Sequence, residues 1–85
     1  MEAYVLLKIS RQNEVYGFGH SVVERLRTIK GVKTVDLLFG EYDAIAKVDV
    51  DRVYNVENLV MEKVATSEGV ESTVTLLCVD EKTLE

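Results

Sequence analysis

The chain has 85 residues, of which 47% are hydrophobic, which predicts one globular domain spanning 1–85. Fifteen acidic against ten basic residues give a formal net charge of −5, and this balance disfavours direct contact with nucleic acid phosphates. Apolar runs such as Val5–Leu7 are far too short to span a bilayer, and no signal peptide is evident, so a cytoplasmic protein is expected.

The first predicted elements are a strand over 3–10 and a helix after it. Side chains of the strand alternate between two faces, as β-structure requires. One face carries Ala3, Val5, Leu7 and Ile9. Asn13 can cap the helix, two glycines delay its firm start to about Ser21, and Gly31 ends it. Its apolar stripe consists of Val15, Phe18, Val22, Leu26 and Ile29.

A second strand is predicted over 32–39 and a third over 44–50, because both segments alternate apolar and polar residues. One face of the second strand carries Val35, Leu37 and Phe39. Only Gly40–Asp43 separates the two strands, and so short a link favours an antiparallel hairpin.

A second helix and a fourth strand complete the pattern. Asp51 can cap this helix, and Gly69 ends it. Its apolar stripe consists of Val53, Val56, Leu59, Val60 and Val64. Residues 70–79 alternate as the fourth strand, and a polar tail follows.

The order β-α-β-β-α-β predicts an α+β, ferredoxin-like fold. Right-handed crossovers place both helices on one face of a four-stranded antiparallel sheet. The other face should then be polar in a monomer. Alternation instead assigns to it a largely apolar set: Tyr4, Leu6, Ile45, Thr73, Thr75, Leu77 and Val79. We therefore predict a two-fold dimer, an α/β sandwich with the sheets packed face to face.

Few residues point to catalysis or to a metal. His20 stands alone at the start of a helix, where it is expected to be solvated, and Cys78 is expected on the helix-facing side of the fourth strand as a small hydrophobe. No metal-ligand spacing and no phosphate-binding glycine loop occur in the sequence. We therefore expect no enzyme, no cofactor and no metal.

The link Gly40-Glu41-Tyr42-Asp43 is the strongest candidate for binding. Glycine allows close approach of the backbone, and the Asp43 carboxylate can hold an ammonium while loop amides hold a carboxylate, as an amino acid requires. A plain hairpin turn also uses Gly and Asp, and on residue chemistry alone that reading is the better one.

At this link the sequence resembles the effector-binding domain of the Lrp/AsnC regulators, known as the RAM domain. The resemblance rests on AYVLLKIS at 3–10, on GVKTVDLLFGEYDAIAKVDV at 31–50 and on GVESTVTLL at 69–77. GEYD matches the family's Gly-x-Tyr/Trp-Asp loop. The chain begins directly at the first strand, without the helix-turn-helix domain of full-length relatives, and 12–20 fits the family pattern poorly.

The resemblance implies dimers that assemble further, commonly to octamers, and binding of an amino acid or related metabolite between subunits. Carried over residue by residue, the ligand site would comprise Gly40, Glu41, Tyr42 and Asp43. The resemblance also adds Thr73 and Thr75, although alternation places these two on the dimer face. A full-length Lrp/AsnC regulator is an expected partner, since the chain itself is not expected to contact DNA.

Two alternatives remain open from the sequence. The module could act purely by co-oligomerising with a regulator, without a ligand. It could also be a small ferredoxin-like dimeric enzyme, such as a cofactor-independent monooxygenase, but those use a polar and aromatic cavity between sheet and helices, and here the predicted core is aliphatic.

Overall fold

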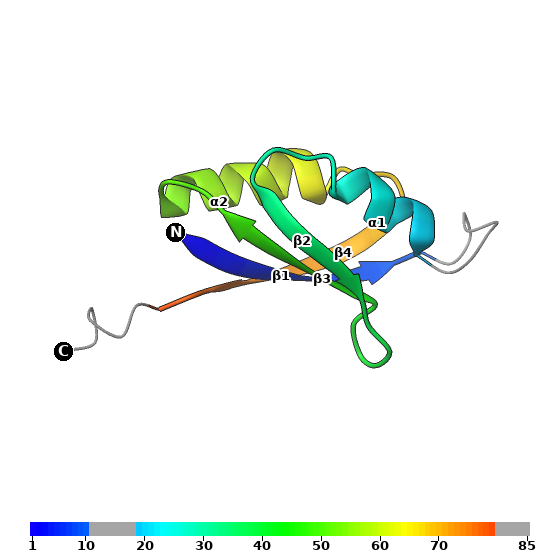
Figure 1. Cartoon of the computed structure of the whole chain (residues 1–85). Coiled ribbons are helices and arrows are strands. Elements are labelled where there is room, and N and C mark those ends of the chain that lie inside the picture. The colour runs from blue at the N-terminus through cyan, green and yellow to red at the C-terminus, as the bar shows by residue number, and fades with distance from the viewer. Residues whose placement is uncertain (11–18, 80–85) are drawn as a thin grey trace.

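The computed structural model describes residues 1–10 and 19–79, and Figure 1 shows their arrangement. In chain order the elements are β1 (Glu2–Ile9), α1 (His20–Leu26), β2 (Val32–Leu37), β3 (Ala44–Asp49), α2 (Val53–Leu59), the π-helical segment η2 (Val60–Val64) and β4 (Val70–Leu77). The predicted order of elements is confirmed. The predictions for Asn13, Val15 and Phe18 lie outside the described residues.

The four strands form one antiparallel sheet in the order β2-β3-β1-β4. Both helices lie on the same face of this sheet, and the other face is left open (Figure 1). This is the ferredoxin-like arrangement that the element order predicts. No helix among the described residues is long and apolar enough to cross a membrane.

The hydrophobic core lies between the sheet and the helices. Every second residue of β1 points into it, so the alternation seen in the sequence becomes a row of buried side chains. The buried residues are Ala3, Val5, Leu7, Ile9, Val22, Val23, Leu26, Val35, Ala44, Ala46, Val48, Val56, Leu59, Val60 and Val64. Small alanines on β3 let the helices approach the sheet closely, and no charged or polar side chain is buried among the described residues.

Both helices end earlier than the glycines that follow them. The first begins at His20, within one residue of the expected firm start, but it stops at Leu26. A turn then leads to Gly31, whose φ of +99° is costly for any residue with a side chain. Thr28 closes this turn by donating its hydroxyl hydrogen to the Arg25 carbonyl oxygen at 2.7 Å.

The predicted cap of the second helix is wrong. Arg52, not Asp51, occupies the N-cap position of α2, and no side chain caps that end. The helix then widens into η2, where the Ala65 N–H donates to the carbonyl oxygen of Val60, five residues back, at 2.7 Å. The wider turn keeps Val60 and Val64 facing the core.

The two faces of β4 are the reverse of those predicted. Ala3 lies opposite Leu77 and Val5 opposite Thr75, so Thr73, Thr75 and Leu77 share the helix-facing side of the sheet. Val74 and Leu76 lie on the open face, and Cys78 is exposed instead of buried. Alternation separates the two sets but does not say which one faces the helices, and β4 is apolar on both sides.

The second strand is shorter than predicted, so Phe39 does not share a strand face with Val35 and Leu37. β2 ends at Leu37, and Phe39 lies in the following loop with its side chain fully exposed. In the sequence, the alternation of apolar and polar residues extends beyond Leu37, but Leu37 is the last residue of β2 that pairs with β3.

Candidate functional site

The predicted binding link forms the tip of the β2–β3 hairpin. The Leu38 N–H donates to the Asp43 carbonyl oxygen at 2.9 Å and closes the loop between them. The loop projects from the sheet on the side away from the helices (Figure 1). The loop backbone at Gly40 is open to solvent, and a methyl group built there would meet no atom within 4 Å.

Asp43 fixes this loop to the neighbouring strand through both its backbone and its side chain. Its N–H donates to the Leu7 carbonyl oxygen at 2.8 Å, one residue beyond the last β1–β3 pair. Its Oδ2 accepts the Ile9 N–H, also at 2.8 Å. The carboxylate therefore serves as the hydrogen-bond acceptor for the Ile9 N–H, in place of a backbone carbonyl oxygen.

A cavity of about 470 Å³ lies between the loop and the ends of two strands. Its walls come from the end of β1, the hairpin loop and the start of β4. The lining residues are Lys8, Ile9, Ser10, Gly40, Glu41, Asp43 and Glu71. The cavity therefore offers three carboxylates and one ammonium for binding a small polar molecule.

A β-bulge supplies one of these carboxylates. The pairing of β1 with β4 shifts from Lys8–Ser72 to Ile9–Val70, which leaves Glu71 without a partner residue in the ladder. The Lys8 ammonium, from a residue that also lines the cavity, lies 5.9 Å from the centroid of the Tyr42 ring, within range of a cation–π contact.

The structure brings together only part of the predicted site. Gly40, Glu41 and Asp43 line the cavity, and Tyr42 lies next to it beside Lys8. The two threonines of β4 do not line it. Thr75 instead faces a separate apolar groove beside α2 and η2, and Thr73 lies opposite Leu7 on the same side of the sheet.

Four lining residues were not predicted: Lys8, Ile9, Ser10 and Glu71. The fold topology could have indicated the first three, because β1 runs between β3 and β4 and its end must lie next to the hairpin loop. Glu71 depends on the bulge, for which the sequence carries no clear signal.

Comparison with known proteins identifies the family. Residues 2–83 match the sequence model of the Lrp/AsnC ligand binding domain. No curated protein matches the chain.

Solved structures support this assignment. FFRP-DM1 is 26% identical, with a TM-score of 0.79 over 92% of this chain and 97% of that one. TTHA0845 from Thermus thermophilus is also 26% identical, with a TM-score of 0.81 over 93% and 92% of the two chains. The transcriptional regulator NMB0573 from Neisseria meningitidis, solved as a complex with L-Met, shares the fold at 15% identity, with a TM-score of 0.74 over 94% of this chain and 50% of its own. The chain belongs to the Lrp/AsnC ligand-binding domain family.

Proposed function

We propose that this domain binds an amino acid or a related small metabolite at the cavity beside Gly40–Asp43, between subunits, and so modulates a transcription regulator. The observation that carries the proposal is the cavity itself, in which the family's loop and the ends of two strands present charged groups of both signs. The cavity is shallow and open on a single chain, so a neighbouring subunit would enclose the ligand.

The chemistry of the cavity fits a ligand with an ammonium group. Asp43 uses Oδ2 to hold β1, and its Oδ1 together with the Glu41 carboxylate can accept hydrogens from the ligand. The Lys8 ammonium can pair with the ligand's carboxylate. Support also comes from NMB0573, a regulator of the same fold whose structure contains L-Met.

The open face of the sheet supports the proposal of a dimer. Ile45, Leu6 and Val74 lie side by side across three strands, and Tyr4 and Leu76 form a second row next to them. Tyr4, Val74 and Leu76 expose 36%, 39% and 51% of their area. A continuous apolar strip of this kind, with charged neighbours around it, is typical of an interaction surface. We propose that two copies pack these faces together about a two-fold axis.

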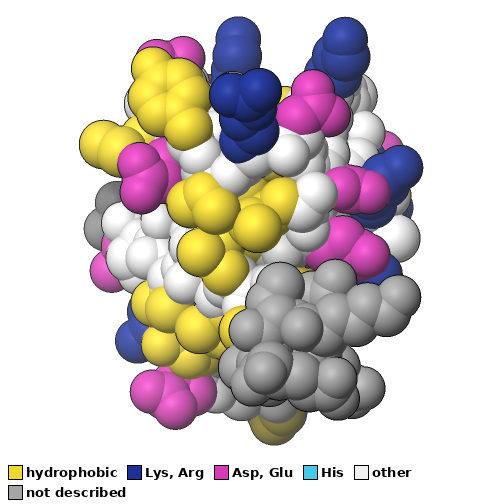
Figure 2. Space-filling view, turned by 90° about the vertical axis from the view of Figure 1, so that its left-hand side faces the viewer, with side chains coloured by type: hydrophobic (Ala, Val, Ile, Leu, Met, Phe, Trp, Pro, Cys, Tyr) yellow, Lys and Arg dark blue, Asp and Glu magenta, His cyan; other side chains and the backbone are white. Residues whose placement is uncertain are grey.

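Further exposed hydrophobic residues support assembly beyond a dimer, such as an octamer. Phe39 at the hairpin tip is fully exposed, and Tyr54 at the start of α2 exposes 69% of its area. Viewed from the end of the molecule where α2 begins, hydrophobic side chains form several groups between charged ones, from the helix layer down to the sheet (Figure 2).

The acidic charge supports an indirect role in transcription. With a formal net charge of −5, a domain of this size is repelled by DNA phosphates. We propose that residues 1–85 act as one sensing domain that contacts a full-length Lrp/AsnC regulator and leaves DNA recognition to that partner.

A thermal-shift screen of the twenty amino acids tests the ligand. At a concentration 100 times its Kd, a ligand raises the stability by about 2.7 kcal/mol, or about 10–20 °C in Tm for a domain of this size. Glu41→Gln and Asp43→Asn should reduce this shift, while Glu62→Gln, an exposed carboxylate on η2, should leave it unchanged. If no amino acid raises Tm, the ligand part of the proposal is wrong, and sedimentation of the unliganded protein still tests the dimer.

A further inference from the structure

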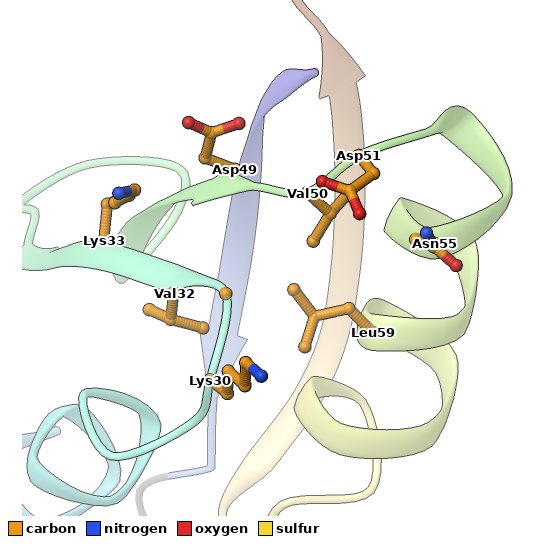
Figure 3. Close-up of a pocket in the computed structure, with 9 residues that line it drawn as sticks. Lys30, Val32, Lys33, Asp49, Val50, Asp51, Asn55 and Leu59 are labelled. Atoms are coloured by element: carbon orange, nitrogen blue, oxygen red, sulfur yellow. The ribbon is translucent and has the colours of Figure 1, made fainter.

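A second cavity, of about 480 Å³, lies at the opposite end of the hairpin that carries the Gly40–Asp43 loop. β2 and β3 pair from Leu37–Ala44 beside the loop to Val32–Val48 at the far end. The cavity opens there, between the end of the hairpin and α2 (Figure 3). Its volume falls within the range of small-molecule sites in proteins, roughly 300–1,000 Å³.

The floor of this cavity is aliphatic. It consists of Val32 and Val50, which are partly buried, and Leu59, which is only 9% exposed. The backbone of Gly31 packs directly against this floor, because a Cβ at that position would lie 3.1 Å from Leu59 Cδ2 and 3.3 Å from Val50 Cγ1. A branched aliphatic group of a ligand would find matching apolar surface here.

The rim of the cavity carries groups of both charges on opposite sides. Lys30 extends from the hairpin side toward α2, while Asp51 and Asn55 lie on the side of the helix (Figure 3). Within 1–10 and 19–79, none of these three side chains has a hydrogen bond or an ion pair. Asp49 differs from them, because its Oδ1 lies 3.4 Å from the N-terminal ammonium.

We propose that this cavity is a second binding site, separate from the loop, for a small zwitterion with a branched aliphatic body. The Lys30 ammonium would pair with the ligand's carboxylate, and Asp51 with the Asn55 side-chain oxygen would accept hydrogens from its ammonium. The aliphatic part would lie on Val32, Val50 and Leu59.

The two cavities differ in the balance of the charged groups that line them. The loop cavity has three carboxylates for one lysine, whereas the lining of the second contains two lysines and two aspartates. The balanced lining favours a molecule with no net charge that carries both signs, and it requires no group from another subunit.

An NMR titration of the full chain with L-leucine tests this site. Amide signals of Gly31, Val32 and Val50 should shift, and two matched probes should bind more weakly: 4-methylpentanoate, which lacks the ammonium, and 3-methylbutylamine, which lacks the carboxylate. Lys30→Gln and Asp51→Asn should each raise the Kd about fivefold, since each removes one ion pair at an exposed rim. Lys63→Gln, which changes an exposed lysine of η2, should leave the Kd unchanged.

The location of the shifts decides the result. Shifts at 31–33 and 49–59 that weaken with Lys30→Gln and Asp51→Asn support the second site. Shifts confined to 38–43 would assign leucine to the loop cavity and overturn the second site while supporting the proposed function. An absence of shifts, or equal binding of all three probes, also overturns it.

Discussion

The two faces of the sheet use residues of the same strand in different ways. Toward the helices, Ala3, Val5 and Leu7 are completely buried. Toward the open side, Tyr4 exposes 36% of its area and Leu6 is only partly buried. The helices of the same chain cover the first face completely, whereas apolar side chains on the second face remain exposed to solvent. The difference suggests that the helix-facing side determines folding, while the open side is available for association.

Among the substitutions that compare the two faces, Leu7→Ala should cause the largest loss of stability. The side chain is fully buried, so its truncation leaves a cavity and lowers the free energy of unfolding by about 2–5 kcal/mol. Leu76→Ala, on the open face with 51% of the residue exposed, is the matched control and should cost less than about 1 kcal/mol in the monomer. Urea unfolding at low protein concentration measures both. Equal losses would mean that the two faces contribute alike to folding.

Gly69→Ala tests how closely α1 packs over the inner face. Gly69 has φ of +91°, and an added Cβ would lie 2.6 Å from Cγ2 of the buried Val22. Strain and overpacking together should cost about 1–3 kcal/mol in the same unfolding assay. Gly40→Ala is the control, because a Cβ there meets nothing and removing glycine freedom from the unfolded chain should be neutral or slightly stabilising. A tolerated Gly69→Ala would show that the helix can move away from the sheet.

Leu6→Lys tests the open face. Leu6 lies at the centre of the apolar strip, between Ile45 and Val74. An ammonium placed there should raise the dissociation constant of the proposed dimer at least tenfold, about 1.4 kcal/mol, because it would be buried without a partner. Sedimentation velocity measures the dissociation constant. Thr66→Lys, at an exposed position after η2, should leave it unchanged, and an unchanged Leu6→Lys dimer would locate the interface elsewhere.

A small pH effect is expected at the edge of the open face. The Lys47 ammonium lies 2.9 Å from Glu2 Oε2, and this hydrogen bond, followed by the charge of Glu2, raises the pKa of Lys47 above its usual 10.5. A raised pKa in the folded state means that the stabilisation is fully present below about pH 10.5 and is lost as the pH rises through the folded value. Thermal melts should therefore place the Glu2→Gln variant slightly below the wild type at about pH 9, with the two converging at about pH 12. A difference that persists at the higher pH would assign it to another contact of Glu2.

The sequence predicts the fold better than it predicts the site. Strict alternation in β1 leaves one consistent inner face, so this element was predicted correctly. Helical spacing placed Val56, Leu59, Val60 and Val64 in the core, but Val53 of the same predicted stripe is exposed at the start of α2. β4 carries apolar residues on both faces, so alternation could not show that Thr75 lies toward the helices. The loop at Gly40–Asp43 was found because its residues are contiguous. Glu71 was missed because its position depends on a register shift against β1, a property of two strands and not of either one.

The reactivity of the Cys78 thiol can be used to follow the association of the protein. It is the only cysteine of the chain, its side chain is exposed, and its N–H donates to the Glu2 carbonyl oxygen at 3.0 Å, which holds it beside the first residue of β1. A thiol-reactive dye would therefore attach at one known position at the margin of the open face. Its rate of reaction, followed as the protein is diluted, would show when that margin becomes accessible to solvent without any change to the sequence.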